Sequence, residues 1–132
     1  DPSNPLGVVG LSIPVANQFV LTEAEQARVA AAADAYNVAI NALAIENDLA
    51  YVDVKTALAE VADTGVSFDG GVITSEFVTG GTFSLDGIHP TPRGYAYTAN
   101  EFIKAINRKY DATVPMVDIG NYGTVTLTNN GG

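Results

Sequence analysis

One stretch of this chain reads Phe83-Ser84-Leu85-Asp86-Gly87-Ile88-His89-Pro90-Thr91-Pro92-Arg93-Gly94. His89 is the only histidine among the 132 residues, and a carboxylate, Asp86, precedes it by three positions. In a tight turn, positions i and i+3 lie on one side, so the carboxylate can accept a hydrogen bond from Nδ1 while Nε2 points outward. The spacing therefore predicts a general base that still needs a nucleophile.

The residues that follow His89 predict a helix over about 92–109. Thr91 is suited to the N-cap and Pro92 to the first helical position. An apolar face follows at helical spacing, formed by Tyr95, Ala99, Phe102, Ile106 and Tyr110. Because the dipole at this helix start disfavours added positive charge, it favours a neutral imidazole that can act as a base.

The part of the chain before this stretch predicts an α/β arrangement. Thr22 and Glu25 form a capping box ahead of a helix over about 23–47, with one apolar face made of Val29, Ala33, Tyr36, Ile40 and Leu43. The alanine content of that helix favours close packing against a sheet. A β-rich run at 49–54 predicts a buried strand, and 55–62 predicts a second, short helix.

An Asp-Gly pair between two β-rich arms predicts a hairpin within 65–83, turning at Asp69-Gly70-Gly71. Residues 1–20 are predicted to be a loop-rich lead-in with one possible strand at Leu6–Ile13. The polar residues 124–132 predict a flexible tail. No internal repeat is present, so 1–132 is predicted to be a single unit.

Composition excludes several classes of function. The chain is 47% hydrophobic and 16% charged, which suits one globular unit with a core. Fifteen acidic residues against six basic ones give a net charge of −9, so we expect no nucleic-acid partner. The absence of cysteine excludes disulfides, and no apolar run is long enough to predict a membrane span.

The block Asp86-Gly87-Ile88-His89-Pro90, with Thr91-Pro92-Arg93-Gly94 after it, resembles the last conserved block of the SGNH hydrolases, the GDSL-type lipases and acylhydrolases. The resemblance covers roughly 21–122 and is strongest over 69–106. It implies a partial three-layer α/β/α sandwich of the flavodoxin-like type with an inserted β-hairpin. It also implies that Asp86 orients His89, and that His89 deprotonates a serine that attacks an ester of an acylated lipid or carbohydrate.

The sequence departs from the family in lacking its nucleophile. Family members place the serine in an early Gly-Asp-Ser block and form the oxyanion hole from that serine's amide with a Gly and an Asn of two middle blocks. None of these blocks precedes His89, and none of Ser3, Ser12, Ser67, Ser75 and Ser84 follows Gly-Asp. We therefore expect the chain to be the C-terminal part of an SGNH domain that is inactive alone.

Other interpretations of the same residues remain. Asp86 and His89 could be a purely structural pair. As metal ligands they would need one or two further ligands, and without cysteine or a second histidine the remaining carboxylates would make only a hard, oxygen-rich site; we expect no metal and no cofactor. Arg93 could bind an anionic substrate or be a solvated first-turn residue. Tyr97, on a different side of its helix from Tyr95, could face solvent or a cleft.

Two functions from different classes follow from these observations. The first is half of an ester hydrolase, which would pair with the N-terminal half of its domain or self-associate because half a sheet exposes an edge. The second is a non-catalytic α/β module for binding or assembly that has lost its nucleophile. By resemblance to exported family members, we expect an extracytoplasmic location.

Overall fold

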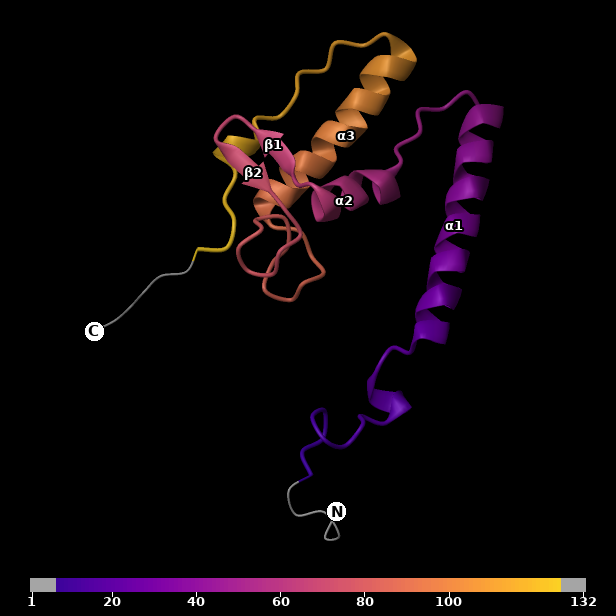
Figure 1. Cartoon of the computed structure of the whole chain (residues 1–132). Coiled ribbons are helices and arrows are strands. Elements are labelled where there is room, and N and C mark those ends of the chain that lie inside the picture. The colour runs from indigo at the N-terminus through magenta and orange to yellow at the C-terminus, as the bar shows by residue number, and fades with distance from the viewer. Residues whose placement is uncertain (1–6, 127–132) are drawn as a thin grey trace, which may run out of the picture. The chain divides into compact units, whose positions relative to one another are not determined.

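The structure, a computed structural model, describes residues 7–126 and has a mixed α/β content (Figure 1). In chain order the elements are the 3-10 turn η1 (Asn17–Phe19), α1 (Glu23–Glu46), α2 (Val54–Asp63), β1 (Val66–Phe68), β2 (Gly71–Ile73), α3 (Pro92–Tyr110) and the 3-10 turn η2 (Ile119–Asn121). The chain forms two compact units that divide within α1, between Leu43 and Ala44.

The first unit contains η1 and most of α1. The predicted capping box is present: the Thr22 amide donates to Glu25 Oε2 (2.9 Å), and the Glu25 amide donates to Thr22 Oγ1 (3.3 Å). These bonds hold the pKa of Glu25 below its ordinary value, the Thr22 backbone amide contributing most. A capped start is encoded within four residues, which is why the sequence predicts it so closely.

The predicted packing of α1 against a sheet is not observed within its own unit. The apolar face is exposed, with Val29 at 61%, Tyr36 at 69% and Ile40 at 53%. In the described part of that unit, residues 7–43, the only β pairing is a single bridge between Val9 and Ile13. Of the possible strand at Leu6–Ile13, the described residues 7–13 therefore form that bridge alone, and Leu6 lies outside the described residues. Without a sheet in this unit, the apolar face has no partner there.

The second unit has a small core between α2, the hairpin and α3. Val61 and Ile73 are fully buried and Tyr97 is 3% exposed, and Ala57, Val66, Phe68 and Ile119 pack against them. The Tyr97 hydroxyl donates to the carbonyl of Ala57 (3.0 Å). Burial raises the pKa of this phenol to about 12, with Glu101 and Glu60 adding to the effect.

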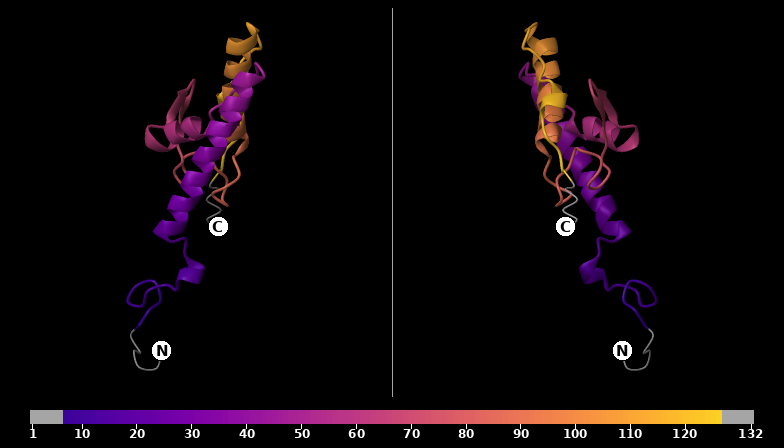
Figure 2. Two further views of the ribbon diagram at one scale, coloured as in Figure 1. Left: turned by 90° about the vertical axis from the view of Figure 1, so that its right-hand side faces the viewer. Right: turned by 90° about the vertical axis from the view of Figure 1, so that its left-hand side faces the viewer.

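The apolar face predicted for α3 is not the side of the helix that is buried. Tyr95, Phe102 and Tyr110 are about half exposed, whereas the buried residues of the helix are Gly94, Ala96, Tyr97, Asn100 and Ala105. Figure 2 shows α2 and the hairpin on the same side of α3, and this is the side on which Tyr97 lies. Tyr97 is therefore a core residue and does not face open solvent.

Polar residues spaced seven apart on α3 bind the segment that returns along the helix (Figure 1). Asn107 exchanges two hydrogen bonds with the backbone of Val114, and buried Asn100 exchanges two with the backbone of Val117. Arg93 Nε donates to the carbonyl of Tyr122 (3.1 Å). The described segment after α3 forms no strand, and these side chains supply hydrogen-bond partners for its backbone.

The β1–β2 hairpin confirms the prediction made from Asp69-Gly70. The two strands are antiparallel, with Val66 opposite Ile73 and Phe68 opposite Gly71. The two-residue loop requires a positive φ, and Gly70 supplies it at 122°. These two strands form the sheet of the described residues.

The predicted strand at 49–54 was wrong, because residues 49–53 have no regular secondary structure. A strand needs a neighbour to complete its ladder, and here the Ala50 amide donates instead to the Tyr110 hydroxyl (3.2 Å). Asp53 accepts from the Thr56 amide (3.0 Å) as the N-cap of α2, so that helix begins at Val54.

No helix among residues 7–126 is both long enough and apolar enough to cross a membrane. Residues 127–132 of the predicted tail at 124–132 lie outside the described residues. Residues 1–6 of the predicted lead-in also lie outside them. Within the described part, Thr124 Oγ1 donates to the carbonyl of Gly81 (3.2 Å).

Candidate active site

Residues 82–91 form a closed loop immediately before α3. The Thr91 amide donates to the carbonyl of Thr82 (2.9 Å), and the Ser84 amide donates to the carbonyl of His89 (2.8 Å). Within the loop, the Gly87 amide donates to the carbonyl of Ser84 (2.9 Å), and Gly87 adopts the left-handed conformation with φ of 69°. Asp86 and His89 are therefore held on one turn whose backbone is hydrogen-bonded to itself.

The Asp86 carboxylate accepts hydrogen bonds on both oxygens. Oδ1 accepts from Ser84 Oγ (2.7 Å) and from the amides of Ile88 and His89 (2.9 Å each), and Oδ2 lies 2.5 Å from His89 Nδ1. These bonds hold the pKa of Asp86 far below its ordinary value, with the Ser84 hydroxyl as the largest cause and the His89 ring next. Asp86 is therefore ionised at neutral pH.

The charge of Asp86 decides which ring nitrogen of His89 carries the proton. An ionised carboxylate can only accept, so Nδ1 must donate to Oδ2. In the neutral ring Nε2 then has a free lone pair. The His89 side chain is 72% exposed, and among the described residues no group hydrogen-bonds Nε2. The geometry leaves Nε2 open to solvent with the tautomer fixed by the carboxylate, which is the arrangement that a general base requires.

The start of α3 anchors this loop. Thr91 Oγ1 accepts from the Gly94 amide (3.1 Å) as the predicted N-cap, and it donates to the carbonyl of Gly81 (2.6 Å). Gly94 lies so close to the backbone of Thr82 that a Cβ on Gly94 would stand 2.2 Å from the carbonyl oxygen of Thr82. Both ends of the loop that carries His89 are thus fixed to the helix.

Arg93 fits neither interpretation made from the sequence. Its guanidinium lies 5.2 Å from the centre of the Phe68 ring, and its Nε is bound to the carbonyl of Tyr122. The Arg93 amide also donates to the carbonyl of Gly123 (3.0 Å). This side chain fastens the returning segment to the start of α3 and is not a free ligand for an anionic substrate.

Serine is the residue that a hydrolytic triad would add, and the described serines do not supply it. Ser84 is adjacent to the pair, yet its hydroxyl donates to Asp86 and not to His89. Ser12 Oγ accepts from the amide of Val8, and neither Ser67 nor Ser75 hydrogen-bonds the imidazole. Ser3 lies outside the described residues. The hydrogen bond between Ser84 and Asp86 was not predicted from the sequence. The sequence feature that could have indicated it is a serine two residues before an aspartate in a turn.

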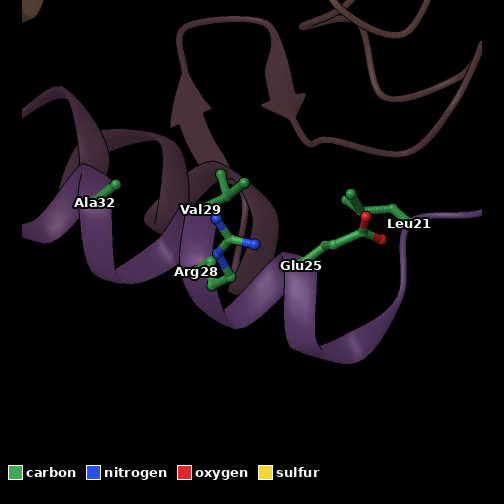
Figure 3. Close-up of a pocket in the computed structure, with 5 residues that line it drawn as sticks. All are labelled: Leu21, Glu25, Arg28, Val29 and Ala32. Atoms are coloured by element: carbon green, nitrogen blue, oxygen red, sulfur yellow. The ribbon is translucent and has the colours of Figure 1, made fainter.

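Two other hollows offer no comparable chemistry. In the first unit, a hollow on α1 is lined by Leu21, Glu25, Arg28, Val29 and Ala32 (Figure 3), where the Glu25 carboxylate already accepts from Thr22. In the second unit, Tyr97 and Asn100 line a hollow beside Asp118, and their polar atoms are bound to backbone. Among residues 7–126, no three His, Cys, Asp or Glu side chains gather in a way that could hold a metal ion.

Comparisons with protein-family models, with curated proteins and with solved structures found no match for this chain. Function is therefore inferred from the chemistry of the loop around Asp86 and His89.

Proposed function

We propose that this chain supplies the Asp-His half of a Ser-His-Asp triad in an ester hydrolase of the SGNH type. The observation that carries the proposal is the 2.5 Å contact between Asp86 Oδ2 and His89 Nδ1, with Nε2 open to solvent. The serine and the oxyanion hole would come from a segment outside these 132 residues. The likeness of the 86–94 block to the last block of that family supports the same assignment.

The chemistry follows from the fixed tautomer. As a serine Oγ attacks the ester carbonyl, Nε2 takes its proton, and Asp86 stabilises the imidazolium that forms. The imidazolium then protonates the alkoxide as the bond between the carbonyl carbon and the alcohol oxygen breaks, leaving an acyl-serine. Nε2 next deprotonates water, which attacks the acyl-serine, and the returning proton releases the serine and the acid.

Without its serine the chain has no basis for rapid turnover. Removing one triad member typically leaves only about 10³–10⁴-fold acceleration over water, and that remainder depends on an intact oxyanion hole. The resemblance offers no oxyanion-hole block in this sequence. The isolated chain is therefore proposed to be inactive.

The finer architecture belongs to the same proposal. The exposed apolar face of α1 and the unpaired β-rich segment 49–53 are what part of a three-layer, flavodoxin-like sandwich would present without the rest of its sheet. The N-terminal half of such a domain, or a second copy of the chain, would cover them. The substrate would be an ester of an acylated lipid or carbohydrate, met outside the cytoplasm.

An esterase assay on two products of the gene tests this function. The chain alone should not hydrolyse p-nitrophenyl acetate above the buffer rate, whereas the product of the complete reading frame should, with sensitivity to a serine-directed inhibitor. In the complete product, His89→Ala should remove at least about 10³-fold of the activity, and the control Ser75→Ala should not change it. Inhibitor-sensitive turnover by the chain alone would refute the assignment of the nucleophile.

The rival function is a non-catalytic α/β module, and the absence of a serine bound to His89 among residues 7–126 is the observation in its favour. The two functions differ in the coding sequence. A Gly-Asp-Ser block encoded in frame before Asp1 supports the hydrolase, and a start codon next to Asp1 supports the module.

A further inference from the structure

We propose that Ser84 is a positioning residue for the Asp86-His89 pair: its hydroxyl orients the Asp86 carboxylate so that Oδ2 faces His89 Nδ1. This inference rests on the proposed function, because it concerns the same base. It adds a third side chain to the site and separates the role of Ser84 from that of the missing nucleophile.

The distribution of donors around Asp86 supports the assignment. Oδ1 accepts three hydrogen bonds, from Ser84 Oγ and from the amides of Ile88 and His89. Oδ2 accepts from the imidazole. Since the carboxylate is planar, fixing Oδ1 also fixes the direction of Oδ2. Ser84 supplies the shortest of the three bonds at Oδ1, 2.7 Å, and the only one made there by a side chain.

The hydroxyl of Ser84 can be removed without changing the hydrogen bonds of its backbone. The Ser84 amide donates to the carbonyl of His89, and the Ser84 carbonyl accepts from the Gly87 amide, so the main chain is fixed on both sides of this residue. Replacing the side chain leaves these bonds in place. The effect of the hydroxyl on the carboxylate can therefore be measured in a loop that keeps its shape.

The same contact argues that Ser84 is not the nucleophile. Its hydroxyl proton is given to Asp86 Oδ1, on the carboxylate side of the imidazole, while the free base is Nε2 on the other side of the ring. A donor bonded to the ionised carboxylate also opposes protonation of that carboxylate. Ser84 thus helps to keep Asp86 an acceptor, which is the condition that leaves Nε2 unprotonated in the neutral ring.

The single histidine makes a direct spectroscopic test possible on the chain as it stands. Nitrogen-15 NMR of the ring reports which nitrogen carries the proton, and the carboxyl carbon-13 signal of Asp86 reports its titration. In the parent chain we expect the Nδ1-H tautomer to dominate, with a slowly exchanging downfield Nδ1 proton. In Ser84→Ala we expect loss of that proton signal, a mixed tautomer and an upward shift of the Asp86 titration midpoint.

Matched variants separate positioning from general structure. Ser84→Thr keeps the hydroxyl and should restore the parent spectrum. Ser75→Ala removes an exposed serine that makes no hydrogen bond among the described residues and should leave the spectrum unchanged. If Ser84→Ala does not fold, Ser84→Cys decides, because its weakly donating thiol should raise the Asp86 midpoint above that of the parent.

The outcomes distinguish this inference from the function on which it rests. An Asp86 midpoint and ring tautomer that stay at parent values in Ser84→Ala, or in Ser84→Cys if the alanine variant is unfolded, would overturn the role of Ser84 and leave the triad proposal standing. A parent chain whose neutral ring is mainly Nε2-H would overturn the triad proposal itself.

Discussion

At the scale of single residues, the tautomer and orientation of the His89 ring are set by its hydrogen bond to Asp86. The i, i+3 spacing of Asp86 and His89 was enough to predict that they meet, because a turn of this length leaves few other arrangements. The three donors on the other carboxylate oxygen could not be predicted, since they depend on the path of the closed loop and the rotamer of Ser84. The sequence therefore predicted the contact between Asp86 and His89, whereas the hydrogen bonds that lower the pKa of Asp86 could be seen only in the structure.

The depressed pKa of Asp86 predicts a contribution to acid stability. A carboxylate whose folded pKa lies below its unfolded value of about 3.9 stabilises the fold at pH values above that unfolded value. The contribution is lost as the pH falls below about 4 toward the folded pKa. Asp86→Asn should therefore be less stable than the parent at pH 7, and the difference should shrink progressively below about pH 4.

Urea denaturation at a series of pH values measures this difference. Asp63→Asn is the matched control, because Asp63 is an exposed carboxylate on α2 with no hydrogen bond among the described residues. A constant gap between Asp86→Asn and the parent from pH 7 to pH 2 would show that the Asp86 carboxylate is not stabilised by its neighbours.

At the scale of elements, helix ends were predictable and helix faces were not. The caps at Thr22 and Thr91 act within three or four residues, so the boundaries of α1 and α3 followed closely from local sequence. The buried side of α3 is decided by where the hairpin and the returning segment lie. Because α3 carries aromatic residues on more than one side, its sequence alone does not show which side is buried.

Thr91 should be the most sensitive cap in the chain. It is 3% exposed, caps α3 through Gly94 and donates to the carbonyl of Gly81. Thr91→Ala should lower the free energy of unfolding by about 2 kcal/mol, because the helix loses its cap and the buried Gly81 carbonyl keeps only its longer hydrogen bond, from Thr124 (3.2 Å). Thr91→Ser keeps both hydrogen bonds and should lose less than half as much. Equal losses in chemical denaturation would show that the methyl group, not the hydroxyl, matters.

Gly94 should reverse the usual preference for alanine in a helix. Gly→Ala inside a helix ordinarily adds about 1 kcal/mol of stability, but a Cβ at Gly94 would meet the carbonyl oxygen of Thr82 at 2.2 Å. Gly94→Ala should therefore lower the melting temperature. Gly123→Ala, at a position with open space around the new Cβ, should leave it nearly unchanged. A melting temperature for Gly94→Ala at or above the parent value would contradict the close approach of the loop to α3.

At the scale of the whole molecule, the apolar side chains exposed on α1 predict association. Ile40 and Leu43 are more than half exposed within a helix that its own unit does not cover. The weight-average mass from light scattering should rise above 13.7 kDa with concentration, and Ile40→Lys with Leu43→Lys should lower it toward that value. The control Ala31→Lys adds charge elsewhere on α1 and should have little effect. A concentration-independent mass of 13.7 kDa in the parent would contradict this prediction.

The overall architecture was the least predictable level. The mixed α/β content and the hairpin followed from local patterns, but the expected strand at 49–54 did not form because a strand depends on a neighbour that its own sequence does not encode. The same dependence applies to the site. Asp86 and His89 come from one short loop and could be paired from sequence, whereas their proposed nucleophile must be brought by another segment.

Active-site labelling tests this last claim most directly. The product of the complete reading frame is treated with a fluorophosphonate, and the modified residue is located by mass spectrometry. We predict that the label falls on a serine encoded before Asp1 and that His89→Ala abolishes it. A complete product that takes up no label, or that is labelled equally with and without His89, would contradict the account.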